Sequence, residues 1–354
     1  MKEAKFSFAK LAAVQAANGA RAAAPQVAPA AARPAADRRQ LHALAGACLS
    51  QIFSAVRECQ ALALEPAATI VRRMAAERPA RDELFSVALH RDQTDRFAVH
   101  HSVNVAVYAI KMAQELAFDE ERQVQIGLAG LLHDVGIALL PEAVIYKKGP
   151  LSVEELNMLR DRPNSAARIL QCLGPEHGLI AESAAQVYER IDGSGYPRGL
   201  KADEIHEYAQ IIGLLDLYEA LVHSRPNREK LSFFEAVKYI FKSCKTQFQR
   251  RYMKSLLRVF TVFPIDSYVQ LNSEAVGKVV EPVPDQPMRP RLQIIYDSQR
   301  RRVLTERFIA LTEAPLLNIV RSLSERELRE LRQGMAAVRE PAEATCDTVG
   351  EPVL

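Results

Sequence analysis

Apolar residues recur at intervals of three and four positions over most of the chain, which is the spacing of amphipathic helices. Residues 39–91 carry this pattern at Leu41, Leu44, Cys48, Ile52 and Val56, with interruptions at Pro66 and Pro79. An amphipathic face needs a partner that buries it. We therefore expect two or three helices here, forming an N-terminal helical layer. A supporting or dimer-forming role and a sensory role are both compatible with this pattern.

Residues 92–264 continue the helical period and are expected to form the main domain. Val105, Tyr108, Met112 and Leu116 mark one apolar stripe, and a further helix is expected over about 120–140. The pairs Ser152/Glu155 and Ser232/Glu235 have the spacing of capping boxes, which begin helices. The pattern predicts a helical bundle.

The pattern changes after Pro264. Residues 267–271, 276–280 and 291–295 read as short strands separated by proline-rich turns. We predict a small β appendage over residues 265–310. Residues 311–354 are expected to form a C-terminal helix and tail, with the helix beginning at a Ser324/Glu327 capping box. The predicted fold class is mainly α.

Residues 1–38 differ from the rest in being rich in alanine and proline. Pro25, Pro29 and Pro34 interrupt the alanines, and few large apolar side chains are present to form a core. We expect a disordered arm, in which residues 6–14 keep a short helical pattern.

Composition excludes several classes of partner. The net charge of +3 over 354 residues is too small to indicate nucleic-acid or membrane-surface binding. No run of about 18 apolar residues is present to span a membrane. The five cysteines follow no metal-binding or disulfide spacing. These features predict a soluble cytoplasmic protein without a membrane span.

Four ionisable residues stand on otherwise apolar helical stripes. They are His101, His133, Asp134 and Asp216. Each alone has an ordinary explanation as a core or capping residue, but a buried carboxylate is costly without compensation. Together they suit iron, manganese or zinc. Such a metal would lower the pKa of water and polarise a phosphoryl oxygen, which makes His133 and Asp134 the candidate catalytic pair.

Four segments resemble the HD-GYP branch of the HD metal-dependent phosphohydrolases. They are His101-Ser-Val-Asn-Val105, Leu131-Leu-His-Asp-Val-Gly136, Glu189-Arg-Ile-Asp-Gly-Ser-Gly-Tyr-Pro197 and Asp216-Leu-Tyr-Glu-Ala-Leu221. The resemblance covers roughly residues 92–305. It implies an HD-type helical bundle with two or three metal ions, commonly iron or manganese, that hydrolyses cyclic di-GMP.

The resemblance is incomplete at the metal site. His101, His133, Asp134 and Asp216 match ligands of that family. The lysine expected after the His-Asp pair is Ile137, and three further expected histidines fall at Arg162, Val187 and Tyr188. The surviving set implies one divalent ion, or none. We expect the Arg162 guanidinium to occupy the region of a second metal, where it binds a phosphate or pairs with Asp134 or Asp216.

Other residues are assigned by the same resemblance. Arg190, Arg162, Lys147 and Arg225 are candidate substrate-binding cations, with Lys147 and its neighbour Lys148 as replacements for the lost lysine. Gly193, Ser194, Gly195, Tyr196 and Pro197 form a shaped loop, because two glycines permit positive φ and close backbone approach. The loop either seats the next helix or contacts GGDEF-domain proteins or the nucleotide.

Three interpretations of function follow. The preferred one is a degenerate HD-GYP protein that binds cyclic di-GMP, a related nucleotide or another protein, with weak or absent hydrolysis. The second is an active phosphodiesterase with a single metal. The third is another HD-type nucleotide phosphohydrolase. A homodimer is compatible with all three.

Overall fold

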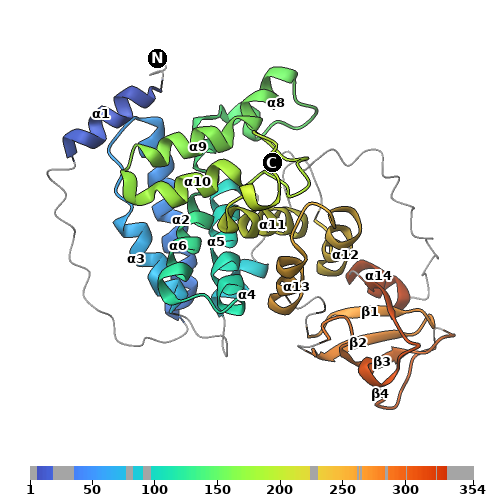
Figure 1. The fold of residues 1–354 in the computed structure, drawn as a ribbon. Helices are drawn as coiled ribbons and strands as arrows, with labels where there is room; N and C mark the ends of the chain where they lie inside the picture. Colours follow the sequence, from blue (N-terminus) through green and yellow to red (C-terminus); the bar gives the residue numbers. More distant parts are fainter. Residues whose placement is uncertain are drawn as a thin grey trace. The chain divides into compact units, whose positions relative to one another are not determined.

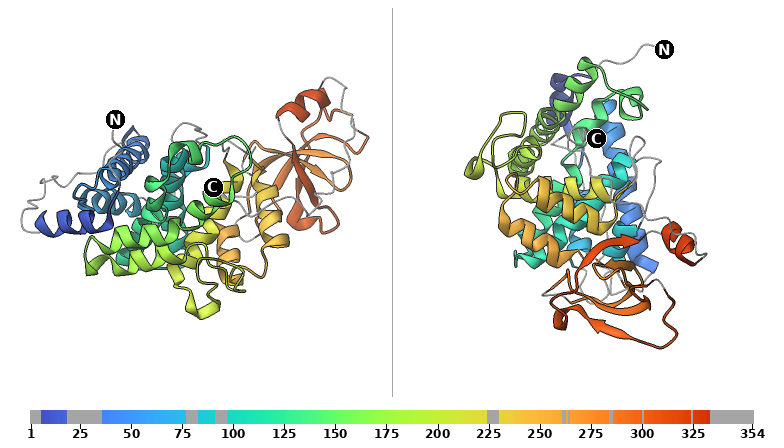
Figure 2. Two further views of the ribbon diagram at one scale, coloured as in Figure 1. Left: turned by 90° about the horizontal axis from the view of Figure 1, so that it is seen from above. Right: turned by 90° about the vertical axis from the view of Figure 1, so that its right-hand side faces the viewer.

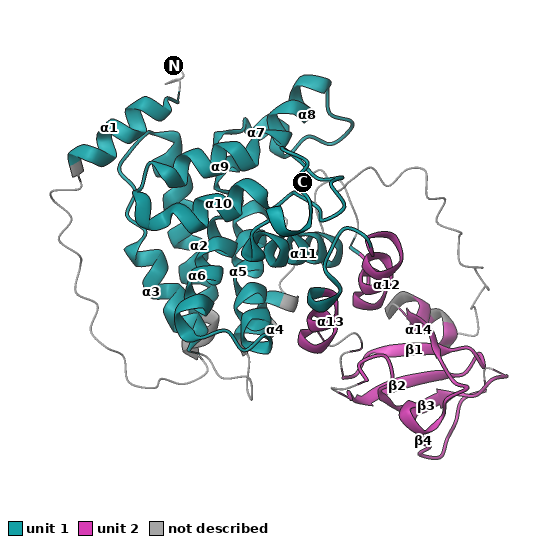
Figure 3. Cartoon of the chain, viewed as in Figure 1, with its two compact units in different colours: residues 1–230, 246–252, 353–354 teal, residues 231–245, 253–352 magenta. Residues whose placement is uncertain are grey.

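The chain folds into two compact units in a computed structural model (Figure 3). The structure describes residues 6–18, 36–76, 83–90, 97–223, 230–260, 263, 265–283, 286–299, 301–323 and 325–332. Described residues up to 230, with 246–252, form the first unit. Residues 231–245 and the described residues from 253 onward form the second.

The first unit is a helical bundle around one central helix, α5 (Figures 1 and 2). Its helices are α1 (Phe8–Asn18), α2 (Ala36–Arg57), α3 (Glu65–Ala75), α4 (Glu83–His90), α5 (Phe97–Glu115), α6 (Glu120–Leu132), α7 (Glu142–Ile145), α8 (Val153–Arg160), α9 (Arg162–Gln171), α10 (Gly178–Gln186) and α11 (Glu207–Val222). Helix α5 packs against α2, α3, α4, α6 and α11. It is buried on all sides, as expected of a helix without a polar face.

Two of the predicted capping boxes are confirmed. The Ser152 hydroxyl accepts from the Glu155 backbone amide at the start of α8. Ser232 and Glu235 do the same at α12. The third predicted cap, Ser324, lies outside the described residues.

The predicted helix over residues 120–140 is wrong in its second half. Helix α6 ends at Leu132, His133 is its C-terminal cap, and a 3-10 helix follows at Val135–Leu139. The backbone approaches α9 closely here, because a Cβ on Gly136 would lie 2.3 Å from the Arg162 carbonyl oxygen. Because the helix ends here, His133 has helical backbone dihedral angles and Asp134 does not.

The N-terminal segment contains a helix where residues 6–14 were expected to keep a short helical pattern, and this helix, α1, continues to Asn18. Helix α1 lies within the stretch assigned to a disordered arm, and residues 1–5 and 19–35 lie outside the described part of the chain. Leu11 is fully buried, and the Gln15 side chain bonds both the amide and the carbonyl of Leu62. Phe8 lies 3.6 Å beneath the Arg168 guanidinium. These contacts fix α1 against the bundle.

The second unit carries an antiparallel sheet of five strands in the order β4-β3-β2-β1-β5. The elements are α12 (Phe233–Ser243), β1 (Tyr268–Leu271), β2 (Val276–Glu281), β3 (Arg291–Tyr296), β4 (Phe308–Ala310), β5 (Ile319–Leu323) and α14 (Glu325–Arg332), and α13 (Arg250–Val259) is shared with the first unit. The three predicted strands are present. Strand β5 lies beyond the predicted boundary at 310, and it and β4 are edge strands, whose half-exposed residues give a weak alternating pattern.

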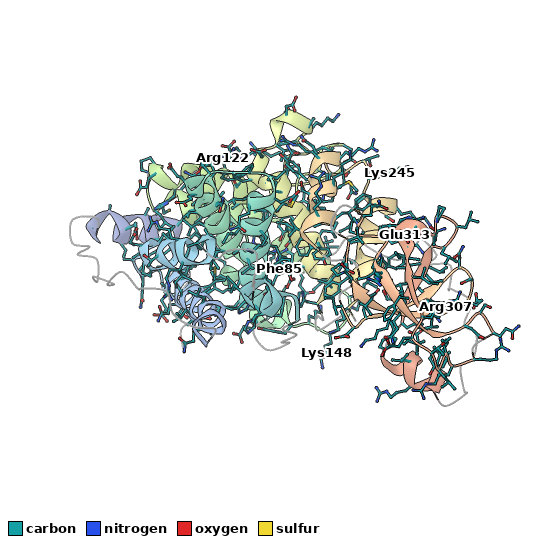
Figure 4. The ribbon with its side chains drawn as sticks, turned by 90° about the horizontal axis from the view of Figure 1, so that it is seen from below. Phe85, Arg122, Lys148, Lys245, Arg307 and Glu313 are labelled. Atoms are coloured by element: carbon teal, nitrogen blue, oxygen red, sulfur yellow. The ribbon has the colours of Figure 1, made fainter. Side chains whose placement is uncertain are left out.

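Side chains of the second unit and of the surface loops are drawn in Figure 4, where Lys148, Arg307 and Glu313 are labelled. A small core joins Val276, Tyr296 and Leu323, with Leu331 of α14 packed against it. Among the described helices of both units, none combines the length and apolarity needed to cross a membrane.

Candidate metal centre

Three of the predicted ligands meet inside the first unit. His101 comes from α5, His133 from the C-terminal end of α6, and Asp216 from α11. One donor atom from each lies within 4.8 Å of the other two, and all three residues are buried. The Oδ1 atom of Asp216 lies 2.8 Å from His101 Nε2 and 3.3 Å from His133 Nε2.

The ring orientation of His133 is set by its own helix. Its Nδ1 lies 2.7 Å from the Gly130 carbonyl oxygen, which can only accept, so Nδ1 carries a proton. The other nitrogen, Nε2, then faces Asp216. A backbone carbonyl on one imidazole nitrogen is a common way of directing the other toward a metal.

The charges at His101 and Asp216 stabilise each other. Burial disfavours a charged His101, but Glu219 and Asp216 outweigh it and raise the pKa of His101 to about 9. Burial alone would raise the pKa of Asp216, whereas its contacts with His101 and His133 hold that pKa well below its usual range. The carboxylate of Asp216 is therefore ionised at neutral pH.

Asp134 does not belong to this three-residue cluster, contrary to the predicted four-residue set. Its Oδ2 accepts from Arg162 Nη1 at 2.7 Å. Its Oδ1 is buried and has no hydrogen-bond partner among the described residues. The donor set of two imidazoles and one carboxylate fits a divalent cation such as iron, manganese or zinc, and the unpartnered Asp134 oxygen belongs to the residue that follows His133 in the chain. His101, His133 and Asp216 would hold such an ion.

Arg162 is one of the most deeply buried charges in the described structure, with 3% of its surface exposed. Besides Asp134, its Nε donates to the Leu159 carbonyl and its Nη2 to the Tyr188 hydroxyl, at 3.1 and 3.2 Å. Burial disfavours its charge, yet the nearby Asp134 carboxylate keeps the pKa of Arg162 raised. The pairing of Arg162 with Asp134 is one of the outcomes anticipated for this arginine.

Two tyrosines complete the surroundings of Arg162. The rings of Tyr188 and Tyr196 stack with centroids 5.2 Å apart and planes 4° apart. Burial raises the pKa of Tyr188, and raises that of Tyr196 to about 12, so both hydroxyls stay protonated. Val187 and Ile137, where the resemblance predicted a histidine and a lysine, are buried apolar side chains. All four residues at which the resemblance is incomplete are therefore buried, and none of them is a histidine or a lysine.

The glycine-containing loop is held by backbone hydrogen bonds. The buried Glu189 carboxylate accepts from the amides of Arg198 and Leu200 at 2.7 and 3.0 Å. Gly193 has φ +82°, and a Cβ on Gly195 would lie 2.4 Å from the Glu189 Cα. A glycine is therefore required at position 193 by the positive φ, and at position 195 by the close approach of the Glu189 backbone.

Two of the other predicted cations have contacts with residues outside this cluster. Arg190 donates to the carbonyls of Val187 and Glu189. Lys147 pairs with Glu155 at 2.5 Å. Lys148 is exposed and its side chain points away from the ribbon (Figure 4). Arg225 lies outside the described residues.

Sequence reasoning missed three residues that support His101. Glu219, one helical turn after Asp216, bonds His101 Nδ1. Its other oxygen accepts from Asn104 Nδ2 at 2.9 Å, and Asn104 Oδ1 lies 2.8 Å from His42 Nε2. The signal was present as two pairs spaced three residues apart, His101/Asn104 and Asp216/Glu219, on buried helices.

The fold and the cluster together define an HD-type helical domain. A family profile described as an HD domain matches residues 64–251, and one described as a KOW domain associated with HD domain matches residues 268–331. The chain belongs to the HD domain family. The motifs and relatives agree on its HD-GYP branch, so that predicted resemblance is confirmed.

Several relatives have names that state an enzymatic activity. The chain is 26% identical over 76% of its length to the cyclic di-GMP phosphodiesterase PA4108 of Pseudomonas aeruginosa, 24% over 56% to the cyclic di-GMP phosphodiesterase PdeB of Borreliella burgdorferi, and 32% over 44% to the 3'3'-cGAMP-specific phosphodiesterase 1 of Vibrio cholerae. It spans 65%, 52% and 37% of these three proteins. A solved structure titled as an HDG"Y"P protein, Bd1817 from Bdellovibrio bacteriovorus, shares the fold with a TM-score of 0.52 at 18% identity, over 62% of this chain and 70% of that one.

Proposed function

We propose that this chain is a degenerate HD-GYP module of cyclic di-GMP signalling. It binds cyclic di-GMP or a related cyclic dinucleotide, with weak or absent hydrolysis, and passes the signal on through a protein partner such as a GGDEF-domain protein. The names of the relatives support the ligand class, since they include both cyclic di-GMP and 3'3'-cGAMP phosphodiesterases.

The observation that carries the proposal is the buried ion pair between Arg162 and Asp134. An arginine cannot be deprotonated at neutral pH. A permanent positive charge therefore lies beside the carboxylate of Asp134. A second divalent cation would meet this charge at short range in a poorly solvated site, where repulsion is large. Without a second cation, the developing charge of phosphodiester cleavage loses part of its stabilisation.

An active single-metal phosphodiesterase is the second candidate. The cluster of His101, His133 and Asp216 favours it, because these three donors are enough for one cation. Bound there, iron or manganese would supply an activated water and a Lewis acid. The Arg162 guanidinium would then serve as the phosphate-binding cation, provided that it leaves Asp134 when substrate enters.

Product analysis separates the two candidates. The manganese-loaded and the iron-loaded protein are incubated with cyclic di-GMP and with 3'3'-cGAMP, and the nucleotides are separated by chromatography. We expect little or no linear product, together with saturable binding in calorimetry. Metal-dependent turnover that His133→Ala and Asp134→Ala both abolish would overturn the proposal and establish the alternative. Absence of both turnover and binding would refute the assigned ligand class.

A further inference from the structure

The supporting contacts of His101 reach beyond the residues matched as an HD domain. The match begins at residue 64, yet His42 of α2 takes part in the buried network around the metal cluster. His42, Asn104, Glu219 and His101 have exposed fractions of 1, 1, 3 and 7%. The helix predicted as a supporting layer therefore places a polar side chain in the centre of the bundle.

With Glu219 ionised, the hydrogen bonds described for this network fix which groups donate and which accept. Glu219 is an acceptor when ionised, so Asn104 must present its Nδ2 amide group to Glu219 Oε1, at 2.9 Å. The Asn104 oxygen then faces His42, at 2.8 Å, and must accept. His42 consequently carries a proton on Nε2. Each bond follows from the ionised state of Glu219.

The same logic fixes His101. Its Nδ1 contacts Glu219 Oε2, and a carboxylate oxygen requires a donor there. With the Nδ1 proton held by Glu219, Nε2 is the nitrogen that faces Asp216 and the metal cluster. His223 adds a third contact to Glu219, with Nδ1 3.2 Å from Oε1. Contacts with Asn104, His101 and His223 therefore orient the Glu219 carboxylate, and His42 of α2 contributes through Asn104.

We propose that His42 is a positioning residue for the metal centre: through Asn104 and Glu219 it holds His101 with Nε2 directed at the metal. The N-terminal helix α2 is thereby part of the site, and a movement of α2 that withdraws His42 would loosen His101. This inference rests on a metal at His101, as does the single-metal alternative, whereas the proposed degenerate module does not require one.

A buried polar chain of this kind acts cooperatively, because each bond polarises the next. Removing an outer-shell partner of a ligating histidine commonly costs about 10- to 100-fold in metal affinity. Glu219→Gln should reach that range. His42 acts one residue further away, so we expect His42→Leu to weaken binding by roughly 3- to 10-fold.

The test uses Co²⁺ as probe on the full chain, with affinity from calorimetry and ligand geometry from the visible absorption of the bound ion. His42→Leu should weaken binding and alter the spectrum. His42→Gln, whose amide can still donate to Asn104, should restore both to within about 2-fold. His177→Gln, at a surface 3-10 helix, is the matched control and should change neither. Unchanged affinity and spectrum in folded His42→Leu would overturn the inference.

A second measurement does not depend on any variant folding. Nitrogen NMR of the Zn²⁺-loaded wild type, labelled with ¹⁵N at histidine, reports which ring nitrogen carries the proton. We expect His42 protonated at Nε2 and His101 at Nδ1. The opposite tautomer at either histidine refutes the inference and leaves the proposed function standing. If the wild type binds no metal at all, the positioning role fails, and the single-metal alternative fails with it.

Discussion

Arg162 donates from Nη1 to Asp134 Oδ2 at 2.7 Å, with side chains only 3% and 6% exposed. The pair joins the start of α9 to the residue that follows the C-terminal cap of α6. Two opposite charges in a poorly solvated interior are stable only while both are present, because either one alone would be buried without compensation. We therefore expect the stability of the bundle to depend on the pairing of Arg162 with Asp134, the residue that follows His133 of the cluster.

The first prediction concerns stability. Arg162→Met leaves the Asp134 carboxylate buried and unpaired, so metal-free protein should lose about 3–5 kcal/mol of unfolding free energy. A divalent ion can then compensate Asp134, so Mn²⁺ should recover part of the loss in the variant. Urea unfolding with and without Mn²⁺ measures both. Arg250→Met, at an exposed position, is the control and should change stability by less than about 0.5 kcal/mol. If Arg162→Met leaves the free energy of unfolding unchanged, the ion pair does not stabilise the fold.

The second prediction concerns stoichiometry. With Arg162 beside the cluster, the wild-type chain should bind no more than one Mn²⁺ or Fe²⁺, since a second cation would be repelled. Equilibrium dialysis followed by elemental analysis gives the number of ions per chain. Arg162→His removes the permanent charge and releases Asp134, so the variant should bind its metal more tightly. Two or more equivalents in the wild type would disprove the role assigned to Arg162.

The third prediction is a pH dependence. In the metal-free protein both ring nitrogens of His101 face carboxylates, and the pKa of His101 is raised to about 9. Because this pKa is above the unfolded value, the protonated histidine stabilises the metal-free fold below about pH 6.5. That contribution is lost as the pH rises through about 9. A metal at Nε2 must displace this proton, so metal affinity should rise by about tenfold per pH unit between pH 7 and 9.

Calorimetry checks the pH prediction directly. Mn²⁺ titrations at pH 7.5 in buffers of different ionisation enthalpy give the number of protons released on binding. We expect about one proton from His101. Binding without proton release, or an affinity that is flat between pH 7 and 9, would contradict it.

The sequence was sufficient to predict the bundle and three members of the cluster. His101, His133 and Asp216 each interrupt an apolar stripe, and a stripe buried in a bundle turns its ionisable member inward. The sequence did not decide whether Arg162 pairs with Asp134, pairs with Asp216 or binds a phosphate. Arg162 is 28 residues from Asp134, and the direction of the Asp134 side chain depends on where α6 ends. The contact of His42 with Asn104 spans 62 positions and has no local signal at all.

Edge strands and helix ends escaped prediction for a related reason. Strand β4 has three residues, and its pattern is decided by pairing with β3 rather than by its own alternation. Helix α6 ends at Leu132 although the apolar period continues to about 140. The cause is tertiary, since residue 136 must pass close to α9, and only a glycine permits that approach.

The fourth prediction tests that approach. In Gly136→Ala the new Cβ would lie 2.3 Å from the Arg162 carbonyl oxygen and 3.0 Å from the Ala166 amide nitrogen, and backbone atoms cannot move aside cheaply. The variant should lose about 1–3 kcal/mol of stability. The displaced α9 should also weaken the contact of Arg162 with Asp134. Gly178→Ala is the matched control, because that glycine has φ −55° and its Cβ would meet nothing within 4 Å. Thermal unfolding of both variants, with Mn²⁺ affinity as a second measurement, decides the matter. If Gly136→Ala resembles Gly178→Ala in both, the close approach of the two segments does not hold Arg162 in place.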